Sequence, residues 1–115
     1  MTNLIDELYD VLNLNNKSVS DILAINIVNT HYTNDDDIDV LISKVGESEN
    51  SIIAKFSELK NYNYDSGFGS AYFDGSVVWF KDGSWLERWE YDGSEGWSYK
   101  ETPVIPYNLR GGDSD

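Results

Sequence analysis

The tripeptide Asp-Gly-Ser, which occurs at residues 74–76, 82–84 and 92–94, constrains the fold more than any other feature of this sequence. An Asp-Gly pair between β-rich runs predicts a tight hairpin turn, because glycine accepts the positive φ angle that such turns require. The runs between and after these tripeptides are VVWF, WLERWEY and WSYKE, which are rich in strand-forming aromatic and β-branched residues. Residues 71–101 are therefore predicted to form an antiparallel meander of about four strands.

Two segments that precede the meander have the spacing of amphipathic helices. Apolar residues recur at helical intervals over residues 3–12, and acidic residues occupy the other side. Thr2 is predicted to be the N-cap of this helix. A second helix is predicted over about 50–60, with a buried apolar stripe and with Ser48 or Asn50 as its cap.

The stretches between these helices predict a β-hairpin. Residues 21–32 and 38–45 are rich in β-branched residues and too apolar for a surface helix, and residues 33–37 form the predicted tip. The expected fold is therefore α+β, with two helices packed on an antiparallel sheet in the order α-β-β-α followed by the meander. The length of 115 residues suits one domain, expected over 1–109, with 110–115 as a flexible tail.

The net charge indicates what kind of partner this chain can have. Twenty-one acidic residues against eight basic ones give −13 and an isoelectric point near 4.1. A field of this sign repels nucleic acid and anionic membranes and favours basic surfaces, so neither direct nucleic-acid binding nor membrane association is expected. Solubility alone is the alternative explanation. No signal-peptide pattern begins the chain and no run approaches the roughly 20 apolar residues of a membrane span, so a cytoplasmic location is expected.

The sequence gives little support to catalysis or to cofactor binding. It has no cysteine, and its one histidine is His31, so a nucleophilic triad would depend on that single residue. The acidic residues at 35–39 lack the glycine and the distal glutamate of a calcium-binding loop. We therefore expect no enzyme, no cofactor and no metal site.

Aromatic side chains of the predicted meander form a second candidate surface. Trp85, Trp89 and Tyr91 alternate with other residues along one strand, and Trp97 and Tyr99 are predicted to continue the set on the next. The favoured interpretation places this set under the helices, because a small sheet needs a covered face. The alternative is a module that binds a small ligand or a carbohydrate. Three aromatic residues outside the meander are predicted to make exposed contacts: Tyr62, Tyr64 and Phe68.

The densest acidic stretch, TNDDDID at residues 33–39, lies at the tip of the predicted hairpin. Duplex DNA carries about one negative charge per 1.7 Å of axis, and proteins that bind it line a groove with arginine and lysine. A folded acidic domain can occupy such a groove, because carboxylates can stand in for phosphates and form bidentate pairs with arginine. The tip is therefore predicted to mimic DNA.

Residues 33–56 resemble the central part of a small acidic phage anti-CRISPR family, which inhibits the RNA-guided DNA nuclease of type II-A systems. The family has an acidic turn, a strand that ends in Ile-Ser, a Ser-Glu-Asn segment and a helix that begins Ser-Ile. The matching positions here are Asp36 with Asp39, Ile42-Ser43, Ser48-Glu49-Asn50 and Ser51–Phe56. Residues 82–106 resemble a C-terminal piece that recurs in short phage and prophage proteins without an assigned function.

The resemblance implies a function and a partner. In the family, the acidic turn occupies the pocket that reads the protospacer-adjacent motif, which such nucleases read with arginines. It implies that Asp36 and Asp39 take this role, supported by Asp35 and Asp37, and that the partner is a guide-RNA-loaded CRISPR nuclease of an infected bacterial cell. The inhibited partner could instead be another host DNA-binding enzyme, such as a restriction or repair enzyme. The candidate partner-binding residues are Asp35, Asp36, Asp37, Asp39, Glu47, Glu49, Tyr62, Tyr64 and Asp65.

Overall fold

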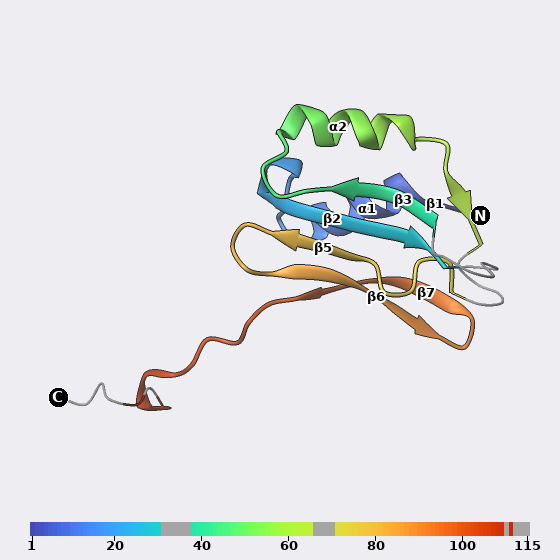
Figure 1. Ribbon diagram of the computed structural model, residues 1–115. Helices are drawn as coiled ribbons and strands as arrows, with labels where there is room; N and C mark the ends of the chain where they lie inside the picture. The colour runs from blue at the N-terminus through green and yellow to red at the C-terminus, as the bar shows by residue number, and fades with distance from the viewer. Residues whose placement is uncertain (31–37, 66–70, 110, 112–115) are drawn as a thin grey trace.

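The computed structural model describes residues 1–30, 38–65, 71–109 and 111. Within these residues the fold is α+β, with two α-helices, a five-stranded antiparallel sheet and a two-stranded sheet (Figure 1). The elements are β1 (Thr2–Asn3), α1 (Leu4–Leu14), η1 (Val19–Asp21), β2 (Ile22–Asn29), β3 (Ile38–Ser43), α2 (Glu49–Glu58), β4 (Asn63–Tyr64), β5 (Val77–Phe80), β6 (Trp85–Tyr91), β7 (Ser94–Lys100) and η2 (Tyr107–Leu109). The order of strands in the large sheet is β3-β2-β5-β6-β7, and β1 pairs with β4.

Helix α1 begins at Leu4, one residue later than predicted. The predicted cap, Thr2, is wrong: Thr2 belongs to β1, and the side chain of Asn3 accepts the capping hydrogen bond from the backbone nitrogen of Asp6 at 3.0 Å. Asparagine caps a helix as well as threonine does, so pairing of Thr2 with Tyr64 of β4 shifts the helix start.

Helix α2 is capped by Ser48, whose side chain accepts a hydrogen bond from the backbone nitrogen of Ser51 at 3.1 Å. This decides between the two predicted caps. Ile52 and Phe56 bury the apolar side of the helix. Among the described residues, no helix is long and apolar enough to cross a membrane.

The predicted hairpin is present as the antiparallel pair β2 and β3, with a register that runs from Ile25 opposite Ser43 to Asn29 opposite Ile38. Strand β2 ends at Asn29, and the backbone nitrogen of the next residue, Thr30, donates to the carbonyl oxygen of Tyr72 at 2.7 Å. His31 to Asp37, which include the predicted tip, lie outside the described residues.

The meander has three strands in residues 71–101, not about four. Gly83 and Gly93 take positive φ angles of 92° and 88° in the turns that join β5 to β6 and β6 to β7, as the Asp-Gly pairs predict. The first Asp-Gly-Ser instead precedes β5, because Ser76 is buried in a turn and its hydroxyl accepts a hydrogen bond from the backbone nitrogen of Val28 at 3.0 Å.

Both helices contribute to one hydrophobic core with a single face of the large sheet (Figure 1). Leu86 of β6 belongs to this core, whereas Trp89 and Tyr91 are 44% and 78% exposed. The favoured placement of the β6 aromatic residues under the helices is therefore wrong. Trp97 pairs with Arg88 across β6 and β7, so it lies on the helix-covered face, opposite to Trp89. Strand alternation predicts two faces, and the helices cover the face of Leu86 and Arg88.

Candidate functional site

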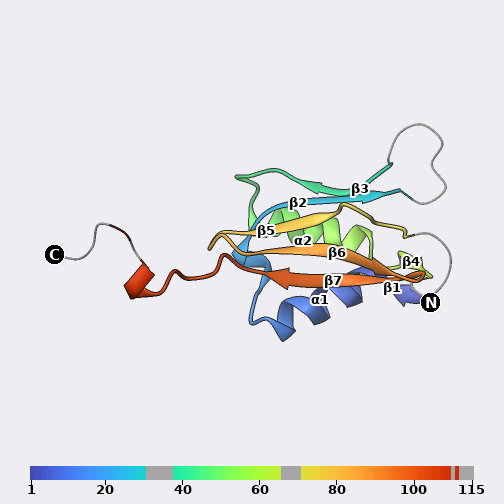
Figure 2. The ribbon, with the colours of Figure 1, turned by 90° about the horizontal axis from the view of Figure 1, so that it is seen from below.

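The acidic end of the large sheet is the end at which β2 and β6 finish and at which β3, β5 and β7 begin. The antiparallel pairing brings these strand ends together, and β4 lies at the same end of the sheet (Figure 2). Carboxylates at or beside these ends come from separate parts of the chain. They are Asp39, Asp65, Asp74, Glu90 and Asp92. Four of them are exposed and Asp65 is half-buried. The strand topology therefore places several accessible negative charges at this end of the sheet.

Several basic residues of the described chain lie away from the acidic end. Three lysines lie at the opposite end of the sheet: Lys44 and Lys81 directly follow β3 and β5, and Lys100 is the last residue of β7. Lys60 is an exception, because it follows α2 and its backbone carbonyl accepts a hydrogen bond from Asn3 near the start of α1. The charge of the described surface is therefore unevenly distributed between the acidic end and the opposite end of the sheet.

Three further basic side chains form ion pairs among the described residues. The pairs join Lys17 to Asp82, Lys55 to Glu47, and Arg88 to both Glu7 and Glu95. Their positive charge is compensated within the chain and does not offset the carboxylates of the acidic end.

The predicted partner-binding carboxylates fall into two groups in space. Asp39, in β3, and Asp65, directly after β4, lie at the acidic end. Glu47 and Glu49 come after the last residue of β3, so they lie at the opposite end of the sheet (Figure 2). Asp35, Asp36 and Asp37 lie outside the described residues. Among the described residues, no cluster of three or more potential ligands could hold a metal ion.

Glu47 has a structural role at the start of α2. It accepts hydrogen bonds from the backbone nitrogen of Lys44 at 2.7 Å and from the hydroxyl of Ser51 at 2.9 Å, and it pairs with Lys55. The hydrogen-bonded ion pair with Lys55 lowers the pKa of Glu47 most, and the hydrogen bonds from Lys44 and Ser51 lower it further, to about 2. The ammonium group of Lys55 also donates to the carbonyl oxygen of Ile42 at 2.8 Å, which ties α2 to the sheet.

The two predicted aromatic contacts of this region differ in exposure. Tyr64 is 1% exposed, so the prediction that it makes an exposed contact is wrong. It is buried because its ring packs against those of Tyr72 and Phe73. Tyr62 is half-buried, and its hydroxyl accepts a hydrogen bond from the side-chain amide of Asn29 at 3.0 Å. Phe68 lies outside the described residues.

A buried polar network lies behind the acidic end, and the sequence analysis missed it. The guanidinium of Arg88 contacts Glu95 at 2.6 Å, Glu7 at 3.2 Å and the hydroxyl of Tyr64 at 3.0 Å. That hydroxyl donates to Glu7 at 2.6 Å. Burial, together with the bond to Glu7, raises the pKa of Tyr64 well above its usual range. Burial opposes the charge of Arg88, but the bonds to Tyr64 and Glu95 outweigh it and its pKa is raised.

The network also fixes the loop before β5. The carboxylate of Glu95 accepts hydrogen bonds from the backbone nitrogens of Tyr72 and Phe73 at 2.5 and 3.1 Å. The signal in the sequence was the position of Arg88, which alternates with Trp89 and shares the parity of the core residue Leu86. An arginine on the buried face of a strand requires an anionic partner.

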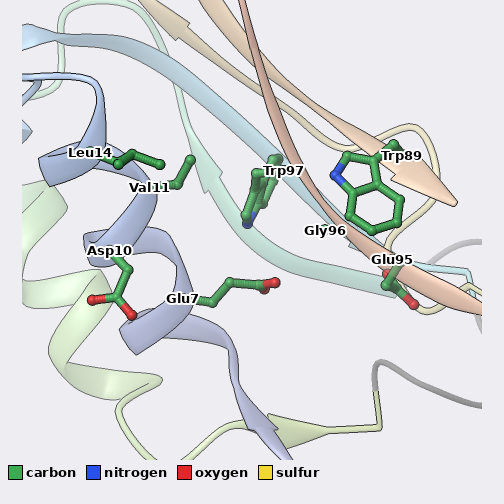
Figure 3. A pocket seen from close by; sticks show the side chains of 8 residues that line it. All are labelled: Glu7, Asp10, Val11, Leu14, Trp89, Glu95, Gly96 and Trp97. Atoms are coloured by element: carbon green, nitrogen blue, oxygen red, sulfur yellow. The ribbon is translucent and has the colours of Figure 1, made fainter.

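A groove of about 440 Å³ lies between α1 and β7 (Figure 3). It is lined by Glu7, Asp10, Val11, Leu14, Trp89, Glu95, Gly96 and Trp97. Its walls are mainly apolar, with three carboxylates among them. None of the predicted partner-binding residues that the structure describes lines this groove.

The structure thus describes an acidic α+β protein with two distinctive surfaces, the acidic end and the groove. A comparison of the chain with protein-family models, with curated proteins and with solved structures finds no match in any of the three. The function must therefore be inferred from the residues of this chain.

Proposed function

We propose that this chain is an inhibitor that binds an RNA-guided type II CRISPR nuclease as a DNA mimic and blocks recognition of the protospacer-adjacent motif. The observation that supports this most is the acidic end, where Asp39 of β3 lies at the same end of the strands as Asp65 and Asp74 of the connection from β4 to β5 and Asp92 of the turn from β6 to β7. Strand β2 finishes and β3 begins at this same end, with Asn29 opposite Ile38. The sequence between these two residues includes Asp35, Asp36 and Asp37.

The chemistry of the partner explains why the acidic end would bind to a DNA-binding nuclease. A nuclease that reads DNA presents arginines in a groove, and arginine pairs with carboxylates through two parallel hydrogen bonds. Carboxylates held by a sheet have fixed positions, so they can match an array of arginines as phosphates do. The inhibitor acts by occupying the groove, so it needs no catalytic residue or cofactor, and it works in the cytoplasm of the infected bacterial cell.

The test measures binding of the purified chain to a guide-loaded type II-A nuclease, with and without target DNA. Asp36→Ala/Asp39→Ala removes two of the carboxylates that the resemblance implicates. Glu49→Ala/Glu101→Ala removes two exposed charges at the opposite end of the sheet, including Glu49, which was predicted to bind the partner but lies away from the acidic end. We expect the first pair to abolish competition with DNA and the second to leave it unchanged. We also expect affinity to fall steeply as salt rises from 50 to about 200 mM, because the contacts are between charges.

Two results would count against this function. Equal effects of the two double variants would show that total charge, not the acidic end, governs binding. Absence of binding to the nuclease would redirect the search to other host DNA-binding enzymes, such as restriction or repair enzymes, whose grooves have the same charge.

A second candidate function is supported by the face of the sheet that the two helices do not cover. Trp79, Trp89 and Tyr91 are 40%, 44% and 78% exposed there, and exposed aromatic rings can stack on sugars or on quaternary amines. A carbohydrate-binding module of this kind would bind a neutral sugar with little dependence on salt, whereas the DNA mimic would not bind one.

A further inference from the structure

The groove between α1 and β7 combines an apolar floor with an unpaired strand edge. Val11 and Leu14 of α1 form one wall, and Trp97 lies opposite them on β7 (Figure 3). The indole of Trp89 lies directly over Gly96, so closely that a Cβ at Gly96 would be 2.8 Å from its ring. In the described part of the chain β7 is the last strand of the sheet. A backbone edge of this kind can pair with an extended segment of another chain.

The charges around the groove favour a cation. Glu7, Glu95 and Asp10 contribute three carboxylates, and Arg88, which pairs with the first two, contributes one guanidinium. Two negative charges remain uncompensated at the groove. Asp10 is exposed, so its carboxylate is accessible to a ligand from solvent.

Two buried donors lie beside the same groove. The indole nitrogen of Trp97 and Nε of Arg88 have no hydrogen-bond partner among the described residues. Trp97 is only 9% exposed, and its nitrogen points into the space between β7 and α1, on the side of Glu7 (Figure 3). A buried N–H without an acceptor is costly, so this position is suited to an oxygen atom of a bound molecule.

We propose that this groove binds an arginine residue of an extended peptide segment. The guanidinium pairs with Asp10, the aliphatic stem packs on Val11 and Leu14, and a main-chain carbonyl oxygen accepts the hydrogen bond of the Trp97 indole. Arginine fits better than lysine because its planar guanidinium can form two parallel hydrogen bonds with the carboxylate of Asp10. This site is separate from the acidic end and does not depend on inhibition of a nuclease.

The test follows the four tryptophan indole N–H signals of the ¹⁵N-labelled full chain by NMR during titration with N-acetyl-arginine methylamide. We expect the Trp97 signal to shift downfield and to saturate as the carbonyl of the probe accepts its hydrogen bond. The neutral isostere N-acetyl-citrulline methylamide should leave that signal in place. Asp10→Asn should weaken binding about two- to fivefold, as expected for one exposed charge pair.

Glu58→Gln is the matched control, because Glu58 is also an exposed acidic residue but lies on α2, away from the groove. It should leave the affinity of the probe unchanged. The proposal is overturned if the Trp97 signal does not move with the arginine probe, if the citrulline probe moves it equally, or if Asp10→Asn and Glu58→Gln have the same effect. Both substituted positions are exposed, so neither variant is expected to unfold the chain.

Discussion

Replacing Arg88 with methionine should destabilise the fold more than any surface substitution. The side chain is 1% exposed and contacts two carboxylates and one phenol. Methionine keeps the aliphatic volume but removes the charge, so the carboxylate of Glu95, also 1% exposed, loses its cation. Glu7 is 21% exposed and can be hydrated after the change, so its loss is smaller.

The size of the effect follows from the remaining partners of Glu95. Removing one member of a buried ion pair costs about 3–5 kcal/mol, because the other charge stays buried. The backbone nitrogens of Tyr72 and Phe73 still donate to Glu95 in the variant, which places the expected cost near the lower limit, about 3 kcal/mol. Domains of this size have a total stability of about 5–15 kcal/mol, so the loss would be a large part of it.

The assay is urea unfolding at pH 7, followed by tryptophan fluorescence and by far-ultraviolet circular dichroism. The series comprises Arg88→Met, Glu95→Gln and the combination of both. The double variant should be more stable than Arg88→Met by about 1 kcal/mol or more, because Glu95→Gln removes the unpaired buried charge. Lys100→Met is the control, since it removes an exposed cation from β7 and should change stability by less than about 0.5 kcal/mol.

The reasoning would be refuted by either of two results. One is an Arg88→Met variant within about 1 kcal/mol of the parent chain, which would show that the buried charges are not coupled. The other is simple additivity of the two substitutions, which would show that Glu95 does not depend on Arg88.

Two further predictions concern single residues. Because the pKa of Glu47 is lowered from 4.5 to about 2 in the fold, its ionised form stabilises the protein above pH 4.5, and this contribution is lost as the pH falls towards 2. Glu47→Gln should therefore flatten the dependence of the urea midpoint on pH in that range, and an unchanged slope would contradict the assignment. Gly96→Ala should displace the Trp89 indole, shift tryptophan emission to the red and cost about 1 kcal/mol of unfolding free energy; unchanged emission and stability would show that the close contact is absent.

Local patterns in the sequence predicted several elements within a few residues. The apolar spacing of α1 and α2 reflects a helix that buries one side, and both helices lie close to the predicted segments. The positive φ angles of Gly83 and Gly93 are a property of the turn itself, so an Asp-Gly pair reveals them without knowledge of the rest of the fold. Hairpin pairing of β2 with β3 follows from the same local logic.

Features that depend on distant residues were not predicted. The alternation of Trp89 with Arg88 defines two faces of β6 but does not reveal which face the helices cover. That choice depends on Glu7, which is 81 positions from Arg88, and on Tyr64, which is 24 positions away. The end of the meander was missed for a related reason, because Ser76 bonds to Val28, 48 positions away, in place of extending a fourth strand. No local periodicity encodes contacts of this length.

The buried network and the acidic end are connected through the chain. Glu95 holds the backbone nitrogen of Phe73, the residue before Asp74, and Arg88 bonds to Tyr64, the residue before Asp65. Two carboxylates of the acidic end are therefore each one residue away from a group that the network fixes. A buried ion pair contributes little net stability compared with apolar packing, so we infer that this pair serves mainly to hold the loop before β5 rigid, through the two backbone hydrogen bonds of Glu95. Under the proposed function that rigidity matters, because bidentate pairing with arginine requires carboxylates at fixed positions.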